Sequence, residues 1–570
     1  MKFRTLAIYL GAILVTVALL FGVRAVQQNL DGKIARHHLR YAGNIKNAPP
    51  LVVVTTVALG SFRGIIADLL WLRAQSLQQK HQYYEMVQLA QWITDLQPGF
   101  AGATCFLAWN MAYNISVTCS SPIDRWRWVN EGLKLLKNKA LEYNPDDPAI
   151  YKEIAWIYAH KLGNVMDDAN EYYKNRLAVE MQNVFGQFPD WKLMAESPVG
   201  REEFLRQHPA DDPLWRGLPG GDPDEKYDRL YAAFRRATAT PAPPEPPPEL
   251  AHIDVKVLNY LRAELLRDEY KLDAKKIYAI NEEYGELDWR TPEAQAIYWA
   301  RESIAVGLRN GAEREINTDR IVNNALYQSF VAGKIMKTDP NLDKWSGIMY
   351  ISFPNLSLVD AVYRIYTDSQ TYHDGQNEFN SSFRTARINF LKEAIYTLYA
   401  YGAYSKADEY FKLLSADEVQ KRLVDGKEVV FRDLEEFVKF EWVDTIKNGN
   451  AKQALTFLQG LIYSCIIYEI NGDHDRALKY ERGARYVYDY YVKTIGTNPR
   501  MQIPPYDYIK LNIQELCLEA LPPDQVRRLR SIILDEQAAR EREARMLELK
   551  MRQRQTPPPG SGAPVPAPAN

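Results

Sequence analysis

Residues 394–414 read AIYTLYAYGAYSKADEYFKLL. Five tyrosines and one phenylalanine alternate with five alanines or glycines, and Gly402 stands in the middle. A glycine readily adopts the left-handed conformation that ends a helix. The stretch therefore predicts a helical hairpin that turns at Gly402. We expect Tyr404 to cover that turn, Ala407 to lie where the helices cross, and Phe411 to fill the adjacent gap.

A similar pattern recurs further along the chain. Gly472, Ala477 and Ala484 repeat the turn and the two small positions, and His474 stands where the tyrosine would be. These spacings resemble the tetratricopeptide repeat (TPR), a 34-residue helical hairpin. The resemblance covers about residues 66–165 and 385–495. Three further stretches match the repeat in part. Gly449, Ala454 and Leu458 match it loosely, and Tyr83, Ile93 and Pro98 fit its second half. ALEYNP at 140–145 is similar to the end of a repeat, and the helix after it carries Tyr151, Ile154, Ala155 and Tyr158.

The resemblance implies a mainly α fold, an alpha-solenoid of TPR-like helical hairpins in two blocks. Such hairpins stack because no single repeat can bury its apolar face alone. Two positions depart from the repeat pattern: Glu481 replaces an expected ring, and Ile395 stands where a small residue is usual. An irregular helical domain is therefore the alternative.

The resemblance also implies a groove, lined by the first helix of each hairpin, that binds another protein or a peptide. A positive charge beside exposed rings suits a carboxylate or an aromatic residue of that partner. The alternative is that stacked neighbours bury the rings. The groove positions fall on Lys152, Trp156 and His160 in one repeat, and on Asn389, Lys392, Tyr396 and Tyr399 in another.

Turn signals and composition divide the rest of the chain. Asp147 before Pro148, and Thr291 before Pro292, predict helix N-termini. Alternation of apolar and polar residues predicts one β-hairpin at 333–353. The expected parts are 1–25, a signal-anchor with a transmembrane helix at 6–23; 26–65, a juxtamembrane segment; 66–185, the first helical block; 186–250, a loop-rich insertion with a proline-rich linker at 240–249; 251–384, a helical region with the hairpin; 385–500, the second block; 501–555, a terminal helix; and 556–570, a disordered Pro/Gly/Ala tail.

The N-terminal segment predicts a membrane anchor. Residues 6–23 carry no charge and would form a helix of about 27 Å, close to the thickness of a bilayer core. Signal peptides have shorter apolar cores, and Arg24 makes a poor cleavage site, so we expect an uncleaved anchor rather than a cleaved signal. The short basic leading tail favours a single-pass protein of the cell inner membrane with a periplasmic body. The Lys and Arg residues that follow the segment favour a cytoplasmic body as the alternative.

A second apolar run, LVVVTTVALGSF at 51–62, comes before the first helical block. Arg63 and Asp68 interrupt its continuation, and a charge near the middle of a membrane span is costly. We expect this run to pack on the first soluble helices. A second crossing, or a stretch that lies on the bilayer surface, is the alternative.

Composition and motifs exclude several classes of function. The 570 residues carry a net charge of −2, which offers no general basic field, so no nucleic-acid partner is expected. Cys105, Cys119, Cys465 and Cys517 are far apart and form no CxxC pair, which argues against a zinc or disulfide framework. The chain has no HExxH, GxSxG, GxxxxGK[ST] or GxGxxG motif. We therefore expect no catalytic residues, no metal and no cofactor.

These observations favour a membrane-anchored helical-repeat scaffold that binds another protein and is not an enzyme. One alternative is a structural subunit of a membrane-associated secretion, pilus or envelope-assembly machine. The other is an enzyme or small-ligand binder with a pocket in the 186–370 region. Identification of a co-purifying partner would distinguish the scaffold, and convergent charged groups in a pocket would favour the ligand binder.

Overall fold

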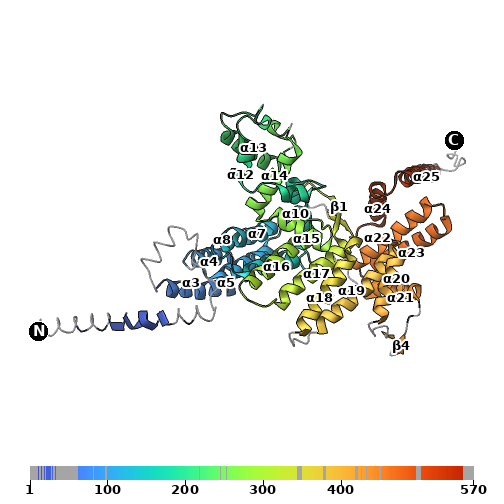
Figure 1. Ribbon diagram of the computed structural model, residues 1–570. Helices are drawn as coiled ribbons and strands as arrows, with labels where there is room; N and C mark the ends of the chain where they lie inside the picture. The colour runs from blue at the N-terminus through green and yellow to red at the C-terminus, as the bar shows by residue number, and fades with distance from the viewer. Residues whose placement is uncertain are drawn as a thin grey trace, which may run out of the picture. The chain divides into compact units, whose positions relative to one another are not determined.

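The computed structural model describes most of residues 62–555 and a few positions between 11 and 33 (Figure 1). The described part is mainly helical, as predicted. The chain divides into two compact units, Met1–Arg384 and Thr385–Asn570. The described positions before 62 are 11, 15, 18–19, 21–26, 28–29 and 33, and the gaps after it are 81, 97–98, 217, 244, 252, 343–349, 376–380, 417–421, 425–426, 430, 432, 449–450 and 496–501.

Several helices of the first unit begin at a polar residue followed by proline. The side chains of Ser121, Asp147 and Thr291 each accept a hydrogen bond from a backbone N–H in the first helical turn, and proline occupies the first helical position. The predicted helix starts at Asp147 and Thr291 are confirmed. The first half of this unit contains α3 (Phe62–Gln79), α4 (Tyr83–Leu96), α5 (Ala101–Trp109), η1 (Asn110–Ile115), α6 (Ser116–Thr118), α7 (Pro122–Leu135), η2 (Leu136–Ala140), α8 (Leu141–Tyr143), α9 (Pro148–Trp156), η3 (Ile157–Leu162) and α10 (Asn170–Phe185).

The insertion after α10 holds more helix than its composition predicts. Helix α13 starts at a cap formed by Asp222 and buries Tyr227, Leu230 and Phe234 along one face. The structure differs here from the predicted loop-rich segment because these apolar residues recur at helical spacing between two proline- and glycine-rich turns. The elements of the insertion are α11 (Trp191–Glu196), α12 (Arg201–Gln207), η4 (Pro213–Trp215), α13 (Pro223–Ala237) and η5 (Pro248–Leu250). The region after it begins with α14 (Val255–Leu265), η6 (Leu266–Tyr270) and α15 (Ala274–Tyr284).

Helix α16 joins parts of the first unit that are far apart in the sequence. It packs against α9 on one side and against α17 on the other. The hydroxyl of Ser303 on α16 donates a hydrogen bond of 2.8 Å to the carbonyl of Pro148. A helix from the 251–384 region thus lies directly on the first helical block. The remaining helices of this unit are α16 (Pro292–Arg309), α17 (Ile316–Ala332), η7 (Leu356–Leu358) and α18 (Val359–Gly375).

Four helices of the first unit contain a π-helical segment, in which a backbone N–H reaches the carbonyl five residues earlier. In η3, for example, the Gly163 N–H donates to the Tyr158 carbonyl at 2.9 Å. Short π-helical segments occur frequently at functional sites. In the described part of the chain these segments are η1, η2, η3 and η6.

The predicted β-hairpin is confirmed. Strands β1 (Lys334–Thr338) and β2 (Tyr350–Phe353) pair antiparallel, with Lys334 opposite Phe353. Asp288 and Arg290 attach β1 to the helices, because Asp288 accepts a hydrogen bond from the Ile335 N–H and Arg290 donates one to the Ile335 carbonyl.

The second unit contains two helical hairpins whose turns have the same geometry. Gly402 and Gly472 have φ values of +78° and +80°, in the left-handed region. In each turn the glycine N–H and the next N–H bond back to carbonyls three and five residues earlier, which is the Schellman motif. The elements of this unit are α19 (Ser381–Ala400), which starts at the end of the first unit, α20 (Tyr404–Ala416), β3 (Arg422–Val424), β4 (Lys427–Val429), α21 (Leu434–Asn448), α22 (Ala451–Ile470), α23 (His474–Thr494), α24 (Tyr506–Ala520) and α25 (Pro523–Gln555).

The small residues of these hairpins lie in the core, as expected from their spacing. Ala407, Ala477 and Ala484 are buried, and Phe411 packs against the ring of Phe437. The turn at Gly472 is capped by Asp473, whose side chain accepts a hydrogen bond from the Arg476 N–H.

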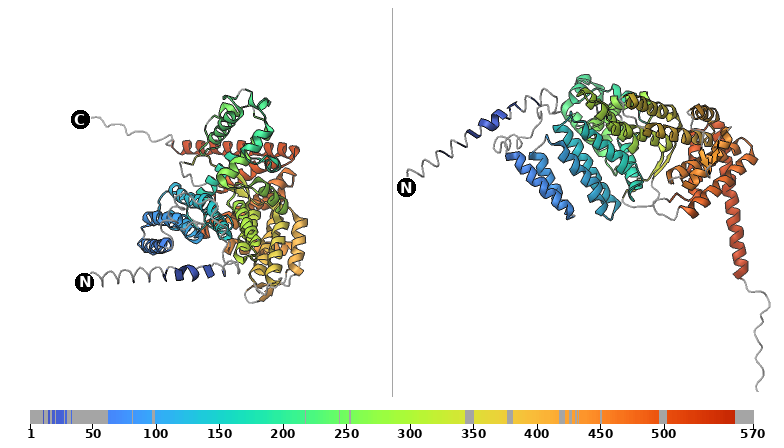
Figure 2. Two further views of the ribbon diagram at one scale, coloured as in Figure 1. Left: turned by 60° about the vertical axis from the view of Figure 1, so that its left-hand side comes forward. Right: turned by 90° about the horizontal axis from the view of Figure 1, so that it is seen from below.

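The C-terminal region contains two helices, α24 and α25, where the sequence predicts one terminal helix. Leu529 near the start of α25 is buried, and Lys510 on α24 pairs with Glu536 at 2.9 Å. Beyond this point α25 extends away from the other helices of its unit (Figure 2). Its start therefore docks on the unit while its end projects.

Most of the predicted anchor and the apolar run at 51–61 lie outside the described residues. Among the residues that are described, no helix is long and apolar enough to cross a membrane. Val15, Leu19, Phe21 and Val23, which are described, are helical and more than half exposed.

Candidate functional site

Four rings form a row on the surface of the first unit, which we call the aromatic ladder: Trp109, Tyr113, His160 and Trp156. The ring centroids of Trp109 and Tyr113 are 5.3 Å apart, those of Tyr113 and His160 are 5.7 Å apart, and His160 stacks on Trp156 at 4.6 Å. Trp109 and Trp156, at the two ends, are 37% and 40% exposed. The ladder thus has a partly exposed tryptophan at each end.

Local helix geometry places these rings in one row. Trp109 and Tyr113 are four residues apart on α5 and η1, and Trp156 and His160 are four apart on α9 and η3, so each pair shares one helix face. The repeat spacing predicts Trp156 and His160 as groove residues, and it assigns no such position to Trp109 or Tyr113. The i, i+4 spacing of aromatic residues in WNMAY was the signal for the second pair.

The third predicted residue of this repeat, Lys152, lies one turn before Trp156 on α9. Its ammonium pairs with the carboxylate of Glu315 at 3.0 Å. The charge of Lys152 is therefore compensated within the chain, and the positive charge that the sequence analysis expects beside the rings is not offered to a partner.

The ladder is uncharged at neutral pH. Burial, and then the charge of Lys161, lower the pKa of His160, while burial raises the pKa of Tyr113. The Tyr113 hydroxyl lies within hydrogen-bond distance of Nδ1 of His160, at 3.2 Å. Burial also raises the pKa of Glu153, whose Oε1 is buried without a hydrogen-bond partner and whose charge raises the pKa of Tyr113.

The second predicted groove set does not form one exposed surface. Asn389 is exposed, and Lys392 and Tyr399 are half-buried. Tyr396 is buried, which corrects the expectation that its ring faces a partner. The physical reason is helix stacking: α19 has neighbours on more than one side, so a ring on its predicted groove face enters the core.

Tyrosines at the two hairpin turns contact one another instead. The Tyr399 ring packs edge-on against Tyr404, and the Tyr404 and Tyr468 hydroxyls are 3.0 Å apart. The Tyr468 ring stacks on Tyr480, and the guanidinium of Arg476 lies 5.3 Å from the Tyr468 ring centroid. Tyr404 thus links the two turns, beyond the covering role that its repeat position predicts.

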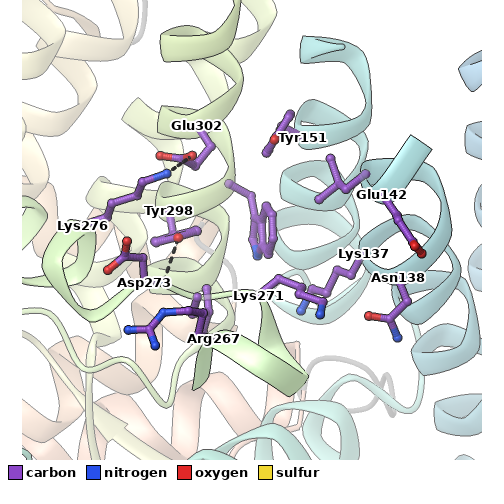
Figure 3. A pocket seen from close by; sticks show the side chains of 13 residues that line it. Lys137, Asn138, Glu142, Tyr151, Arg267, Lys271, Asp273, Lys276, Tyr298 and Glu302 are labelled. Carbon is purple, nitrogen blue, oxygen red and sulfur yellow. Dashed lines mark hydrogen bonds and ion pairs between the residues drawn. The ribbon is translucent and has the colours of Figure 1, made fainter. Parts of the chain in front are cut away.

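A separate cavity of about 610 Å³ opens between η2, η6, α15 and α16 of the first unit (Figure 3). Charged side chains from opposite walls line it, together with the aromatic residues of α9 and α16. The lining consists of Lys137, Asn138, Leu141, Glu142, Tyr151, Arg267, Lys271, Leu272, Asp273, Lys276, Tyr298, Trp299 and Glu302. We call it the Lys137 cavity.

Lys137 is the most unusual residue of this cavity. Its side chain is 7% exposed, and its ammonium lies 5.0 Å from the Tyr158 ring centroid and 5.2 Å from the Trp299 ring centroid. Its Nζ donates a hydrogen bond of 2.9 Å to the Tyr158 hydroxyl. Burial lowers the pKa of Lys137 to about 7, and the charge of Glu180 raises it only in part. Nothing in the sequence marks Lys137 as a binding residue, because the segment LKLLKNKA indicates only a basic helix.

Three of the four cysteines and one histidine in the described part of the chain occupy sites that limit their reactivity. Burial raises the pKa of Cys105, Cys465 and Cys517 to about 12, so these thiols stay protonated and are poor nucleophiles at neutral pH. His373 contacts Asp319 at 2.8 Å, but both side chains are buried. No group of three or more His, Cys, Asp or Glu residues that could hold a metal ion occurs among the described residues.

A larger cavity of about 1160 Å³ lies between α11 and α12 of the insertion and α14. Its walls are mainly apolar, with Phe204, Leu214, Val257 and Tyr260 among them. The hydroxyl of Tyr260 is already bonded to that of Tyr227 at 2.9 Å. The larger cavity therefore combines a mainly apolar surface with polar side chains of both charges, among them Glu196, Arg216 and Lys256.

No family model matches the chain, and no curated protein or solved structure matches it. The two candidate sites are thus defined by their own geometry. The aromatic ladder is an exposed row of rings, and the Lys137 cavity is a charged hollow that is open to solvent.

Proposed function

We propose that this protein is a membrane-anchored helical-repeat scaffold, and that its aromatic ladder binds a segment of a partner protein. The observation that carries the proposal is the exposed row of Trp109, Tyr113, His160 and Trp156. Aromatic residues are enriched at the energetically dominant positions of protein interfaces. Two of these four residues occupy the groove positions that the TPR resemblance implies.

The chemistry of the ladder favours an aromatic or a basic side chain on the partner. The four rings are uncharged at neutral pH, and a cation that lies over a tryptophan face is attracted by the ring. Glu153, whose charge acts on Tyr113, adds a side chain with one buried carboxylate oxygen that has no hydrogen-bond partner. Because Lys152 is already paired with Glu315, a carboxylate of the partner gains little here.

The membrane anchor of the proposal rests on residues 6–23. The described apolar side chains of this segment are exposed, and a bilayer would cover them. A periplasmic body in the inner membrane places the ladder where it can meet other envelope proteins. The stacked arrangement of TPR-like hairpins belongs to the same proposal, supported by the two matching turns at Gly402 and Gly472.

Site-specific photo-crosslinking in intact cells tests this function. A photoreactive amino acid at Trp156 is expected to capture one recurrent protein partner. The same group at Phe188, which is 86% exposed elsewhere in the first unit, is the matched control. If position 156 yields no adduct, or the same adducts as position 188, the ladder is not the partner site. Trp109→Ala should weaken the specific adduct at position 156.

A second observation favours the alternative of a structural subunit in a larger membrane machine. Ile65, Leu69 and Leu72 of α3 are each more than half exposed, and their spacing puts them on one helix face. An exposed apolar face of this kind commonly marks an assembly surface. Leu69→Glu with Leu72→Glu should then reduce the size of the complex in native gels of solubilised membranes. Leu478→Glu, at an exposed position of the second unit, is the control.

A further inference from the structure

We propose that the Lys137 cavity is a binding site for a small organic anion that carries a carboxylate or a phosphate group. The oxyanion would lie against the amino groups of Lys137 and Lys271. Its apolar part would lie against Tyr151, Tyr298 and Trp299. The volume of about 610 Å³ is within the range of small-molecule sites.

Hydrogen-bond donors without acceptors point to an anionic ligand. An ammonium has three N–H donors, and Lys137 donates one hydrogen bond, to the Tyr158 hydroxyl. Among the ion pairs of the described residues, none includes Lys137. Trp299, which is 1% exposed, has an indole Nε1–H that is buried and has no hydrogen-bond partner. Since buried donors are nearly always satisfied, an acceptor of a bound molecule is the natural partner here.

Two of the cations that line the cavity are held in ion pairs and two are not, and the carboxylates of Glu142 and Asp273 also line it. Lys276 pairs with Glu302, and Arg267 pairs with Glu264. Asp273 already accepts a hydrogen bond from the N–H of Lys275 at the start of α15. Lys271 donates to the backbone carbonyl of Asp268 at 2.7 Å and, like Lys137, has no carboxylate within ion-pair distance among the described residues.

Lys137 attracts an oxyanion strongly because its burial removes competing water, whereas Lys271 is exposed and adds an attraction that solvent weakens. The aromatic walls reinforce this effect: the ammonium of Lys137 is held by ring faces, which attract it without neutralising its charge. An oxyanion supplies both the missing negative charge and the missing acceptors. Neither the aromatic ladder nor the apolar cavity of the insertion combines an unpaired buried cation with a buried unsatisfied donor.

Binding should depend on pH. Burial lowers the pKa of Lys137 to about 7, so its ammonium is lost as pH rises through that value and the anion should then bind less tightly. Other titratable or charged groups face the same space and can change the midpoint. They are Lys134, Glu142, Tyr151, Tyr158, Glu180, Arg267, Glu269, Tyr270, Lys271, Asp273, Lys276, Tyr298 and Glu302.

Titration calorimetry on the full-length chain in detergent tests the proposal. The probes are phenyl phosphate and benzoate, with benzyl alcohol as the uncharged control. At pH 6 at least one anion should bind at least tenfold more tightly than benzyl alcohol, and its affinity should fall at pH 8.5. The ratio of the two anion affinities distinguishes a phosphate site from a carboxylate site. If neither anion binds more tightly than benzyl alcohol at pH 6, the proposal is overturned.

Two variants and one control locate the binding. Lys137→Met removes the charge and is expected to weaken the preferred anion at least tenfold. Trp299→Phe keeps an aromatic wall and removes the Nε1–H, and a loss of about threefold to tenfold is expected. Lys139→Met changes a lysine two residues from Lys137 that does not line the cavity and should leave the affinity unchanged. Equal losses in all three variants, or no loss in the first two, would show that the anion binds elsewhere.

Discussion

At the residue scale, Lys137 combines burial with the absence of a carboxylate partner. Burial of a charge without an ion pair is costly, and proteins usually avoid it by changing the protonation state. Two aromatic faces and one tyrosine hydroxyl contact the ammonium of Lys137, and these contacts offset only part of the cost of burying its charge. The residue therefore reduces stability at neutral pH, as expected of a group retained for binding.

Lys137→Met should stabilise the protein most below pH 7. The pKa of Lys137 is about 7 in the folded chain and about 10.5 ordinarily, so between these values the unfolded chain holds a proton that the folded chain lacks. Wild-type stability therefore rises with pH over this window, and the penalty is complete below pH 7. We expect Lys137→Met to raise the free energy of unfolding by about 2 to 5 kcal/mol at pH 6. The gain should shrink towards pH 10.

Urea unfolding at pH 6 and pH 9 measures this difference. Lys139→Met should show no such dependence, because that side chain is only half-buried. A Lys137→Met variant that is less stable than the wild type at pH 6 would mean that the aromatic contacts outweigh the cost of burying the charge.

Ala407 offers a second test at the residue scale. Its methyl group is fully buried between helices, whereas Ser405, two residues earlier on α20, is exposed. Ala407→Leu adds three carbons to a filled space and should cost about 1 to 3 kcal/mol. Ser405→Leu should be close to neutral.

Amide hydrogen exchange measures which parts of the chain lose protection in Ala407→Leu. Loosening should be confined mainly to the second unit and be much smaller at residues 66–165, because repeats couple chiefly to their neighbours. If Ser405→Leu loosens the second unit and Ala407→Leu does not, the position of α20 in the hairpin is wrong.

At the element scale, the approach of α22 to α19 depends on one glycine. A Cβ atom added at Gly460 would lie 2.6 Å from the Cβ of Ala400 and 3.1 Å from the ring of Tyr401. The hydroxyl of Ser464 also donates to the Ala400 carbonyl at 2.6 Å. The two helices thus touch along a face that has no room for a further methyl group.

Gly460→Ala should therefore destabilise the second unit, although alanine is the better helix former. We expect a loss of about 1 to 3 kcal/mol from overpacking. Gly483→Ala on α23 is the matched control: a Cβ there meets nothing within 4 Å, so helix propensity alone should stabilise by about 0.5 to 1 kcal/mol. Thermal unfolding followed by circular dichroism compares the two. Equal changes of the same sign in both variants would argue against close packing of α22 on α19.

At the scale of the whole molecule, removal of residues 1–25 tests the membrane anchor. The shortened chain should move from the membrane pellet to the soluble fraction, and its melting temperature should stay the same because the body keeps its contacts. Fractionation at high salt, with and without detergent, measures the distribution. A shortened chain that still pellets with membranes would identify the apolar run at 51–62 as a second anchor.

Local patterns in the sequence were enough to predict much of this protein. The glycine turns at 402 and 472, the capped helix starts at Asp147 and Thr291, the β-hairpin near 333–353 and the mainly helical class each depend on a few adjacent residues. Steric limits on the backbone and helical periodicity act over such short distances, so a single sequence reveals them.

Which side chains contact one another depends on the tertiary structure, because the contacting residues are distant in sequence. The Lys137 cavity requires α16 to lie on α9, although more than a hundred residues separate these helices in the sequence, and no local pattern specifies that contact. The same holds for the burial of Tyr396, which helix stacking draws into the core, and for the pairing of Lys152 with Glu315. Burial and pairing are properties of the packed chain, because each depends on neighbours that are distant in sequence. The sequence therefore determined the helices and their turns, and the packing of those helices determined which lysine is paired and which lies buried in a cavity.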